Sequence, residues 1–326
     1  MNPAAATAII PNWNGQVLLE KLLKDLPNQS EPFDRVFVVD NGSTDDSVKT
    51  AQRLGAEVIR FERNLGFAPA VNAGVARSIT PLVAVLNNDV RLHRDWLASL
   101  KPELLDGKIS GACGKILQEK QQKRIDGTFD AISRAGCAWR CGSDREDGPM
   151  WNIKRQVSLI PFTAAVFRRT AWEDIGGLDI RFESYLEDVD FGIRAASKGY
   201  TGIYQPAAIA WHQGSATRGM WHPATTRQIS RNQVWIIAKH YSEKALLRYG
   251  WPIAIGQAAW GLVAIRHGSG IAFLRGKIEG VFGVGSMRSE ARFAPEDFFA
   301  QSENDIRELQ QAVGMDPYWR LYFAIT

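Results

Sequence analysis

Short apolar runs alternate with helical patterns through the first part of the chain. Four runs have the length and composition of strands, and the segments between them repeat apolar residues at helical spacing. The expected strands are 7–11, 35–40, 57–61 and 82–87, and the expected helices are 17–26, 46–54 and 69–78. This alternation is typical of βαβ units, so the sequence predicts an α/β fold with a mostly parallel central sheet flanked by helices.

Polar clusters follow three of these expected strands. Residues 12–15 follow the first strand, residues 40–43 the second and residues 87–89 the fourth. In an open parallel sheet, a ligand binds outside the carboxyl ends of the strands. The placement of the clusters therefore predicts a ligand site at that edge of the sheet.

The pattern becomes irregular after residue 106. Residues 107–156 contain charged and glycine-containing stretches that fit strands, an excursion or a loop equally well. Beyond them, a strand at 162–167 and helices at 170–175 and about 187–197 are expected. After residue 212 the character changes again, because tryptophans and aliphatic residues are mixed there with many Lys and Arg.

Composition narrows the classes of protein. With 326 residues and 45% hydrophobic content, the chain can bury a large core, and its net charge of +4 is too small to indicate a nucleic-acid partner. Its three cysteines cannot all pair within the chain, and the N-terminus lacks the pattern of a secretory signal. We therefore expect a reducing, cytoplasmic location, with Cys137 and Cys141 as buried thiols, not as half of a zinc site.

One uncharged apolar stretch, 249–265, is bounded by Arg248 and Arg266. It lies at the short limit for a membrane-spanning helix, which needs about 17 to 25 residues. Pro252 and Gly256 weaken a spanning helix further. An interfacial or buried helix is therefore the expected structure.

Two of the strand-end clusters contain candidate ligand groups. Asp40 is placed to accept the ring N–H of a uracil or thymine base, and Asp89 is placed to hold Mg²⁺ or Mn²⁺ through a carboxylate oxygen. The structural alternatives are a turn with a helix N-cap around Asp40 and a plain turn at residues 87–89.

A third cluster, Glu187-Asp188-Val189-Asp190, opens an expected helix. Acids are favoured at a helix N-terminus without any catalytic role. Their mutual repulsion also raises pKa values, which suits a general base that acts on a hydroxyl group. His212, which follows Trp211, is a candidate ligand for the same cation, with a packed core histidine as the alternative and His222 as a competing ligand.

Together these segments resemble family 2 glycosyltransferases, in particular the bacterial branch that includes rhamnosyltransferases of cell-surface polysaccharide synthesis. The matching segments are IIPNWNG (9–15), VVDNGSTD (38–45), NLGFA (64–68) with Asn72 and Gly74, LNND (86–89), GGLD (176–179), YLEDVDF (185–191) and WH (211–212). They cover roughly the first two-thirds of the chain, and their order makes the combination specific.

The resemblance implies a GT-A type catalytic domain over 1–226, with a nucleotide-sugar half at about 1–106 and an acceptor half at about 107–226. A mainly helical extension over 227–326 would contact a membrane or a second copy, or cap the domain. The implied residue roles are as follows: Pro11, Asn12, Asn14, Asp40, Asn64 and Asn88 bind the nucleotide, Asp89 and His212 bind the divalent cation, Asp188 is the general base, and Glu187 and Trp211 shape the acceptor site.

The implied activity is inverting transfer of a sugar from a nucleoside diphosphate, with dTDP-rhamnose favoured over a UDP-sugar, to a glycan or polyprenyl-linked acceptor. The implied location is the inner face of the cytoplasmic membrane. One departure concerns the metal motif, which commonly reads Asp-X-Asp: here Asn87 stands first, so the site lacks one negative charge. A non-catalytic sugar-nucleotide-binding protein and a nucleotidyltransferase are the competing hypotheses.

Overall fold

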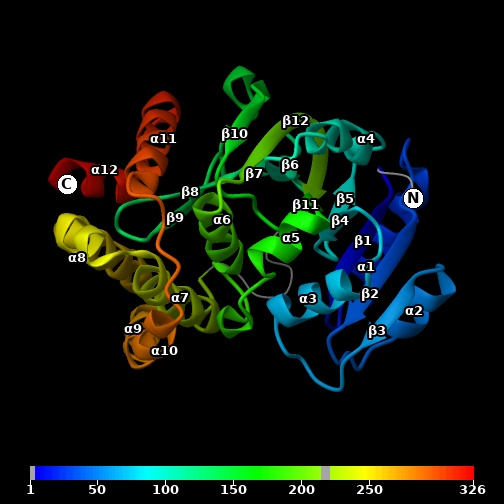
Figure 1. The fold of residues 1–326 in the computed structure, drawn as a ribbon, viewed down its shortest axis with the longest axis horizontal. Coiled ribbons are helices and arrows are strands. Elements are labelled where there is room, and N and C mark those ends of the chain that lie inside the picture. The colour runs from blue at the N-terminus through cyan, green and yellow to red at the C-terminus, as the bar shows by residue number, and fades with distance from the viewer. Residues whose placement is uncertain (1–3, 214–220) are drawn as a thin grey trace.

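A mixed sheet runs through the centre of the computed structural model, which describes residues 4–213 and 221–326 (Figure 1). Within that part of the chain, the strand order is β10-β12-β6-β11-β4-β1-β2-β3, with β5 beside β12 and β7 beside β6. The strands are β1 (Ala6–Asn12), β2 (Arg35–Asp40), β3 (Glu57–Arg60), β4 (Leu82–Leu86), β5 (Val90–Leu92), β6 (Ile109–Gln118), β7 (Ile125–Gly127), β10 (Arg155–Val157), β11 (Ala164–Arg168) and β12 (Thr201–His212). A separate hairpin pairs β8 (Asp130–Ile132) with β9 (Ala138–Arg140).

The predicted parallel arrangement holds for β1 to β4, which form one parallel group. The sheet is mixed beyond β4, because β11 runs antiparallel to both β4 and β6, whereas β6 and β12 are parallel to each other. The helices of this part are α1 (Gln16–Asp25), α2 (Ser47–Arg53), α3 (Phe67–Arg77), α4 (Trp96–Leu100), α5 (Arg169–Ile175) and α6 (Glu187–Ser197). The strands and helices expected from the sequence pattern are therefore confirmed, with ends that differ by one or two residues.

Both faces of the sheet are buried, which explains the continuous apolar runs. In β4, Val83 and Val85 join one core cluster, whereas Leu82, Ala84 and Leu86 join the other. Helix α3 covers the first cluster and α1 covers the second. The carboxyl ends of the strands are left as the place where polar side chains can gather.

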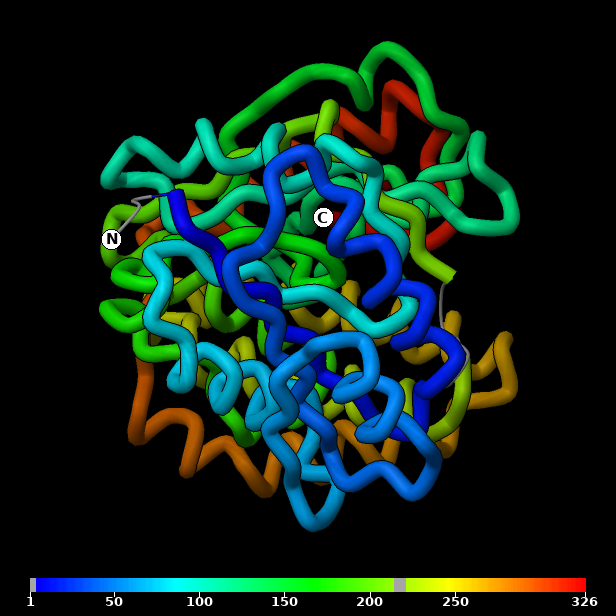
Figure 2. Tube along the Cα trace, turned by 90° about the vertical axis from the view of Figure 1, so that its right-hand side faces the viewer, coloured from blue at the N-terminus to red at the C-terminus, as the bar shows by residue number. Residues whose placement is uncertain are grey.

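The C-terminal part is helical, as expected. Its helices are α7 (Pro223–His240), α8 (Glu243–Arg266), α9 (Gly270–Phe282), α10 (Val284–Ser289), α11 (Phe298–Val313) and α12 (Pro317–Ile325). Figures 1 and 2 place these helices on the side of the molecule opposite β1, β2 and β3. The division at residue 226 stays a prediction, and it falls inside α7.

Helix α11 connects the extension to the β8–β9 hairpin. Ser302 accepts a hydrogen bond from the backbone N–H of Ile132 at 2.8 Å, and the Arg134 guanidinium lies 2.6 Å from Glu303. The hairpin is therefore held against helix α11 of the C-terminal part.

The apolar stretch 249–265 lies within α8. No helix among the described residues is both long and apolar enough to cross a membrane. Cys113, Cys137 and Cys141 are free and buried, and burial raises the pKa of each thiol. The expectation that Cys137 and Cys141 are buried thiols is therefore confirmed.

Candidate active site

The predicted nucleotide-binding residues gather at the carboxyl ends of three neighbouring strands. Asn12 ends β1 and lies beside Asp40, which ends β2, in the parallel register. The Asn88 side chain, just after β4, donates a hydrogen bond to Asn12 Oδ1 at 2.8 Å. The backbone N–H of Asn14 donates to Ser43 Oγ at 2.9 Å. Residues from three separate segments thus form one hydrogen-bonded edge.

Gly15 allows this edge to close. A Cβ at this position would lie 2.2 Å from Nδ2 of Asn88 and 2.8 Å from Oδ1 of Asn12. Any side chain larger than hydrogen would therefore displace the Asn12–Asn88 contact.

Asp40 carries an unpaired buried oxygen. Its side chain is fully buried, and its Oδ2 accepts a hydrogen bond from the backbone N–H of Ser43 at 3.2 Å. Its Oδ1 has no hydrogen-bond partner among the described residues. A buried acceptor without a donor costs free energy, so this oxygen fits a ligand that brings an N–H group.

Pro11 and Asn64 lie at the margin of the same edge. Pro11 is paired with Val39 in the register of β1 and β2. Asn64 Oδ1 accepts from the backbone N–H of Gly66 at 2.9 Å, in the loop before α3. Asn41, which the sequence analysis did not single out, ties this loop to β2 through bonds of 2.8 and 2.9 Å to Leu65 and Gly66.

Asp89 and His212 are brought together, as the sequence suggested. His212 Nε2 lies 3.2 Å from Asp89 Oδ1, and both side chains are about nine-tenths buried. His212 Nδ1 lies 3.0 Å from Oδ2 of Asp126, a residue of β7 that sequence reasoning missed. Burial alone would lower the pKa of His212, but the bonds to Asp126 and Asp89 outweigh it and raise the pKa to about 9.

The β8–β9 hairpin adds two charged groups to the site, Asp130 and Arg140. Arg140 lies 4.0 Å from Asp126 and 3.4 Å from Asp130. Burial and the neighbouring Asp188 raise the pKa of Asp130 to about 7, against the opposing effect of Arg140. The Arg140 guanidinium therefore lies between the Asp126 carboxylate, which contacts His212, and the acids that begin α6.

Glu187 and Asp188 begin helix α6, as predicted. Burial raises the pKa of Asp188, and burial together with the charge of Asp188 raises the pKa of Glu187 well above its usual value. Oε2 of Glu187 is buried and has no hydrogen-bond partner among the described residues. A carboxylate with a raised pKa is a stronger base, so this end of α6 is suited to accept a proton.

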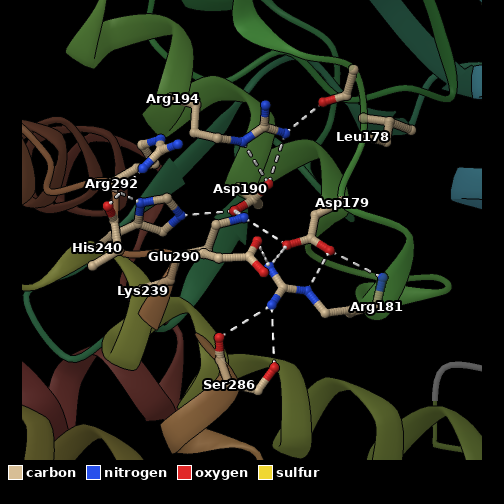
Figure 3. Close-up of polar contacts among 12 residues, drawn as sticks. Leu178, Asp179, Arg181, Asp190, Arg194, Lys239, His240, Ser286, Glu290 and Arg292 are labelled. Atoms are coloured by element: carbon tan, nitrogen blue, oxygen red, sulfur yellow. Dashed lines mark hydrogen bonds and ion pairs between the residues drawn. The ribbon is translucent and has the colours of Figure 1, made fainter. Parts of the chain in front are cut away.

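The third acid of the motif, Asp190, has a different role. It is fully buried and contacts Arg194 at 2.8 Å, Lys239 at 2.7 Å and His240 at 2.9 Å (Figure 3). Burial on its own would raise the pKa of Asp190, but these three groups outweigh it and hold the pKa well below the usual range. Lys239 and His240 belong to α7, so this network fixes α6 to the C-terminal extension.

Two further residues from the sequence analysis lie apart from these groups. The ring of Trp211 lies 6.3 Å from the ring of His93, and adjacent residues of a strand face opposite sides, so Trp211 turns away from the side chain of His212. His222 is the N-cap of α7 and accepts a hydrogen bond from the backbone N–H of Ala224 at 3.2 Å. The acceptor role of Trp211 stays a prediction.

No group of three or more His, Cys, Asp or Glu among the described residues is arranged to hold a metal ion. Two adjacent ligands of an octahedral ion lie about 3 Å apart, which is close to the 3.2 Å between Asp89 and His212. Such ions are commonly held by one or two protein groups together with substrate phosphates. This pair therefore fits a divalent cation that is completed by a diphosphate.

The curled mixed sheet, with a polar edge at β1, β2 and β4 and an acidic helix beside it, is a GT-A type α/β domain. Residues 7–176 match the model of glycosyl transferase family 2, which is more than half of the chain. The protein belongs to glycosyl transferase family 2.

Two curated relatives come from Mycobacterium tuberculosis. The pre-mycofactocin glycosyltransferase is 30% identical over 210 residues, which are 63% of this chain and 42% of that protein. The N-acetylglucosaminyl-diphospho-decaprenol L-rhamnosyltransferase is 27% identical over 230 residues, which are 62% of this chain and 73% of that protein. The match to the first relative thus spans less than half of its length.

Two solved structures share the fold. One is the mannosyltransferase PcManGT from Pyrobaculum calidifontis in complex with GDP-Man and Mn²⁺, with a TM-score of 0.53, 17% identity and coverage of 98% of this chain and 86% of that chain. The other is GalNAc-T7 with UDP, GalNAc and Mn²⁺, with a TM-score of 0.64, 12% identity and coverage of 96% and 58%. At these identities the likeness defines the fold alone.

Proposed function

We propose that this chain transfers a sugar from a nucleoside diphosphate to an acceptor hydroxyl with inversion and with the help of a divalent cation. The observation that carries the proposal is the pairing of a base site with cation ligands at one sheet edge. Asp40, whose Oδ1 is unpaired, is the last residue of β2. Asp89 follows β4 and contacts His212, which is the last residue of β12.

The proposed reaction is a direct displacement. The acceptor oxygen attacks the anomeric carbon as the bond from that carbon to the diphosphate oxygen breaks, and the acceptor proton passes to the Asp188 carboxylate. The raised pKa of Asp188 brings it closer to neutral pH, which favours that proton transfer. Arg140 lies among the carboxylates and offsets part of their repulsion.

Asp89 and His212 would hold Mg²⁺ or Mn²⁺, which would neutralise charge on the departing diphosphate. Asp126 contacts His212 and Asp130 contacts Arg140, and both acids lie within the stretch proposed as the acceptor half. Glu187 lies beside Asp188, where it would shape the acceptor site.

The proposed donor is dTDP-rhamnose, with a UDP-sugar as the alternative. The L-rhamnosyltransferase among the relatives supports a rhamnosyl donor, and the diphospho-decaprenol in its name supports a polyprenyl-linked acceptor. A polyprenyl-linked acceptor would place the protein at the inner face of the cytoplasmic membrane. The alternative is that the C-terminal helices form the contact of a homodimer.

The experiment that tests the donor class is a thermal-shift screen of nucleoside diphosphate sugars with Mg²⁺ and Mn²⁺. Only ligands that bind the folded form raise its apparent stability. We expect a cation-dependent rise with a thymidine or uridine diphosphate sugar. A rise with nucleoside triphosphates alone would support a nucleotidyltransferase instead, and a rise without any cation dependence would support a sugar-nucleotide-binding protein.

Replacing Asp40 with Asn tests the base site. The change keeps the shape of the side chain but removes the charge that strengthens a hydrogen bond from the base, so we expect donor affinity to fall by about 10- to 100-fold. Calorimetry with the nucleoside diphosphate measures the effect. Asp46→Asn, at an exposed residue of the same segment, is the control, and equal affinity for Asp40→Asn and this control would contradict the assignment.

Replacing Asp126 with Asn tests how His212 is oriented. The Asp126 carboxylate holds Nδ1, which directs Nε2 toward Asp89. Removing such an orienting carboxylate typically lowers metal affinity by about 10- to 100-fold. Mn²⁺ binding in the presence of a nucleoside diphosphate, followed by electron paramagnetic resonance, measures this. Asp144→Asn, in an exposed turn nearby, should bind Mn²⁺ like the wild type, and an unchanged affinity in Asp126→Asn would rule out the orienting role.

A further inference from the structure

Helix α9 packs with its small residues inward. A Cβ at Gly276 would lie 2.1 Å from the backbone oxygen of Arg227, and one at Gly280 would lie 2.7 Å from Cβ of Val234. Both of these partners belong to α7, and Ala272 on the same face is also buried. The side of α9 that meets the protein therefore carries almost no apolar surface.

The opposite side of α9 carries the large apolar residues. Five apolar residues lie along this side at helical spacing, and they are between 57% and 85% exposed: Ile271, Leu274, Ile278, Val281 and Phe282. A helix of a water-soluble domain normally buries its large apolar residues and exposes its polar ones. In α9 the pattern is reversed.

Helix α8 exposes a second apolar row. Six residues one helical turn apart form it: Leu247, Trp251, Ala254, Ala258, Leu262 and Ile265. The four large residues of this row are 60% to 89% exposed. No charged or polar residue interrupts the row.

The two rows form one surface. A Cβ at Gly261 of α8 would lie 2.8 Å from the ring of Phe273 of α9, and Lys277 of α9 bonds to Gln257 of α8, so these residues form the seam between the helices. Because α8 and α9 run antiparallel, their helical periodicity turns both rows to the same side of that seam. We name this surface the α8–α9 face.

Unpaired positive charge lies within the α8–α9 face. Arg266 and Arg275 are exposed and form no ion pair or hydrogen bond with the described residues, and the exposed His267 lies at the turn between the helices. The one acid on α9, Glu279, is paired with Arg227 at 3.0 Å. The face therefore combines a wide apolar surface with free cationic groups.

We propose that the α8–α9 face lies on an anionic lipid surface. Helices that lie in a membrane interface bury large apolar side chains at the level of the headgroups, and their Arg and Lys contact anionic lipids. A symmetric dimer through the same face would bring the arginines of one copy toward those of the other, which is unfavourable.

Trp221 packs against the turn between α8 and α9. The ring of Trp221 stacks on that of His267 at 4.2 Å, and Ser269 donates a hydrogen bond to the Trp221 carbonyl at 2.7 Å. The proposal deepens the proposed function and rests on it, because contact with a lipid surface would bring the protein to the membrane that holds a polyprenyl-linked acceptor.

Vesicle co-sedimentation of the full chain tests the proposal. We expect wild-type protein to bind vesicles of phosphatidylglycerol and phosphatidylcholine in equal parts, and to bind pure phosphatidylcholine weakly. The double variant Leu274→Ser/Phe282→Ser should bind the anionic vesicles at least about tenfold less, because two apolar anchors are lost. Leu105→Ser, at an equally exposed leucine of the catalytic part, is the matched control and should bind like the wild type.

A second variant isolates the charge contribution. Arg266→Gln/Arg275→Gln leaves the apolar rows intact and should lose the preference for anionic vesicles, with the wild-type preference also falling as salt rises. Each variant is also tested for its thermal shift with a nucleoside diphosphate sugar. An unchanged shift with lost vesicle binding supports the membrane face whatever the donor proves to be.

Three results would overturn the proposal. One is the absence of wild-type binding to anionic vesicles, and another is equal binding of wild type and Leu274→Ser/Phe282→Ser. The third is a wild-type dimer, found by light scattering, that the same double variant dissociates in the absence of any vesicle binding. That outcome would assign the face to a second copy of the chain.

Discussion

Replacing Asp188 with Asn is expected to lower kcat by about 10²- to 10⁴-fold, which is the typical cost of losing a general base. The side chain keeps its size and can still accept the hydrogen bond from the Val189 N–H, now 2.8 Å long, so the start of α6 should persist. The donor should bind as before, because the nucleotide cluster lies on other elements. The rate of transfer is measured under saturating donor, and the donor affinity is measured by calorimetry. Together they separate an effect on kcat from an effect on donor binding.

The structure also offers two competing bases near Asp188. Glu187 and Asp130 both have raised pKa values, and both interact electrostatically with Asp188. Glu187→Gln and Asp130→Asn should therefore be measured beside Asp188→Asn, with Asp174→Asn at an exposed ion pair as the control. A wild-type rate in Asp188→Asn together with a collapsed rate in Asp130→Asn would move the general base to Asp130.

Replacing Asp190 with Asn is expected to destabilise the fold by about 3–5 kcal/mol, because Arg194, Lys239 and His240 would lose their shared carboxylate in a buried site. Urea unfolding of the variant and the wild type measures the difference. Asp174→Asn, which breaks an exposed pair with Lys198, should change the stability little. A near-wild-type stability for Asp190→Asn would contradict the view that this network fixes α6 to α7.

The contribution of Asp190 should also depend on pH. Its pKa is lowered in the folded state, so its stabilising effect is fully present above the unfolded value of about 3.9 and is lost as the pH falls below it. The difference in unfolding free energy between wild type and Asp190→Asn should therefore be constant between about pH 5 and about pH 7. It should narrow below about pH 4, and a difference that grows on acidification would contradict the assigned charge.

The regular part of the fold was predictable because its signals are local. Strands β1, β2 and β4 are mainly apolar and largely buried, and each is followed by a polar cluster that can be recognised in the sequence. The pairing of Asp89 with His212 could be anticipated as a hypothesis about two cation ligands, which the resemblance to a family strengthened. The contact itself depends on the pairing of β5 with β12, because the two residues lie far apart in the chain.

The arrangement of Asp126, Asp130 and Arg140 could not be predicted in the same way. Asp126, Asp130 and Arg140 come from strands of three residues each, too short to produce a clear alternation. Their positions depend on contacts with distant segments, such as the bond between Ser302 and Ile132. The different role of Asp190 was also hidden, because its partners Lys239 and His240 lie on a helix that the motif does not include.

The most direct test of the central claim is transfer of a radiolabelled sugar from its nucleoside diphosphate to a polyprenyl-diphosphate-linked acceptor, measured with Mn²⁺ present and after its chelation. We predict product formation with Mn²⁺, release of one nucleoside diphosphate per sugar transferred, and loss of both on chelation. Donor binding without transfer to any hydroxyl acceptor, in the presence or absence of the cation, would contradict the assignment as a glycosyltransferase.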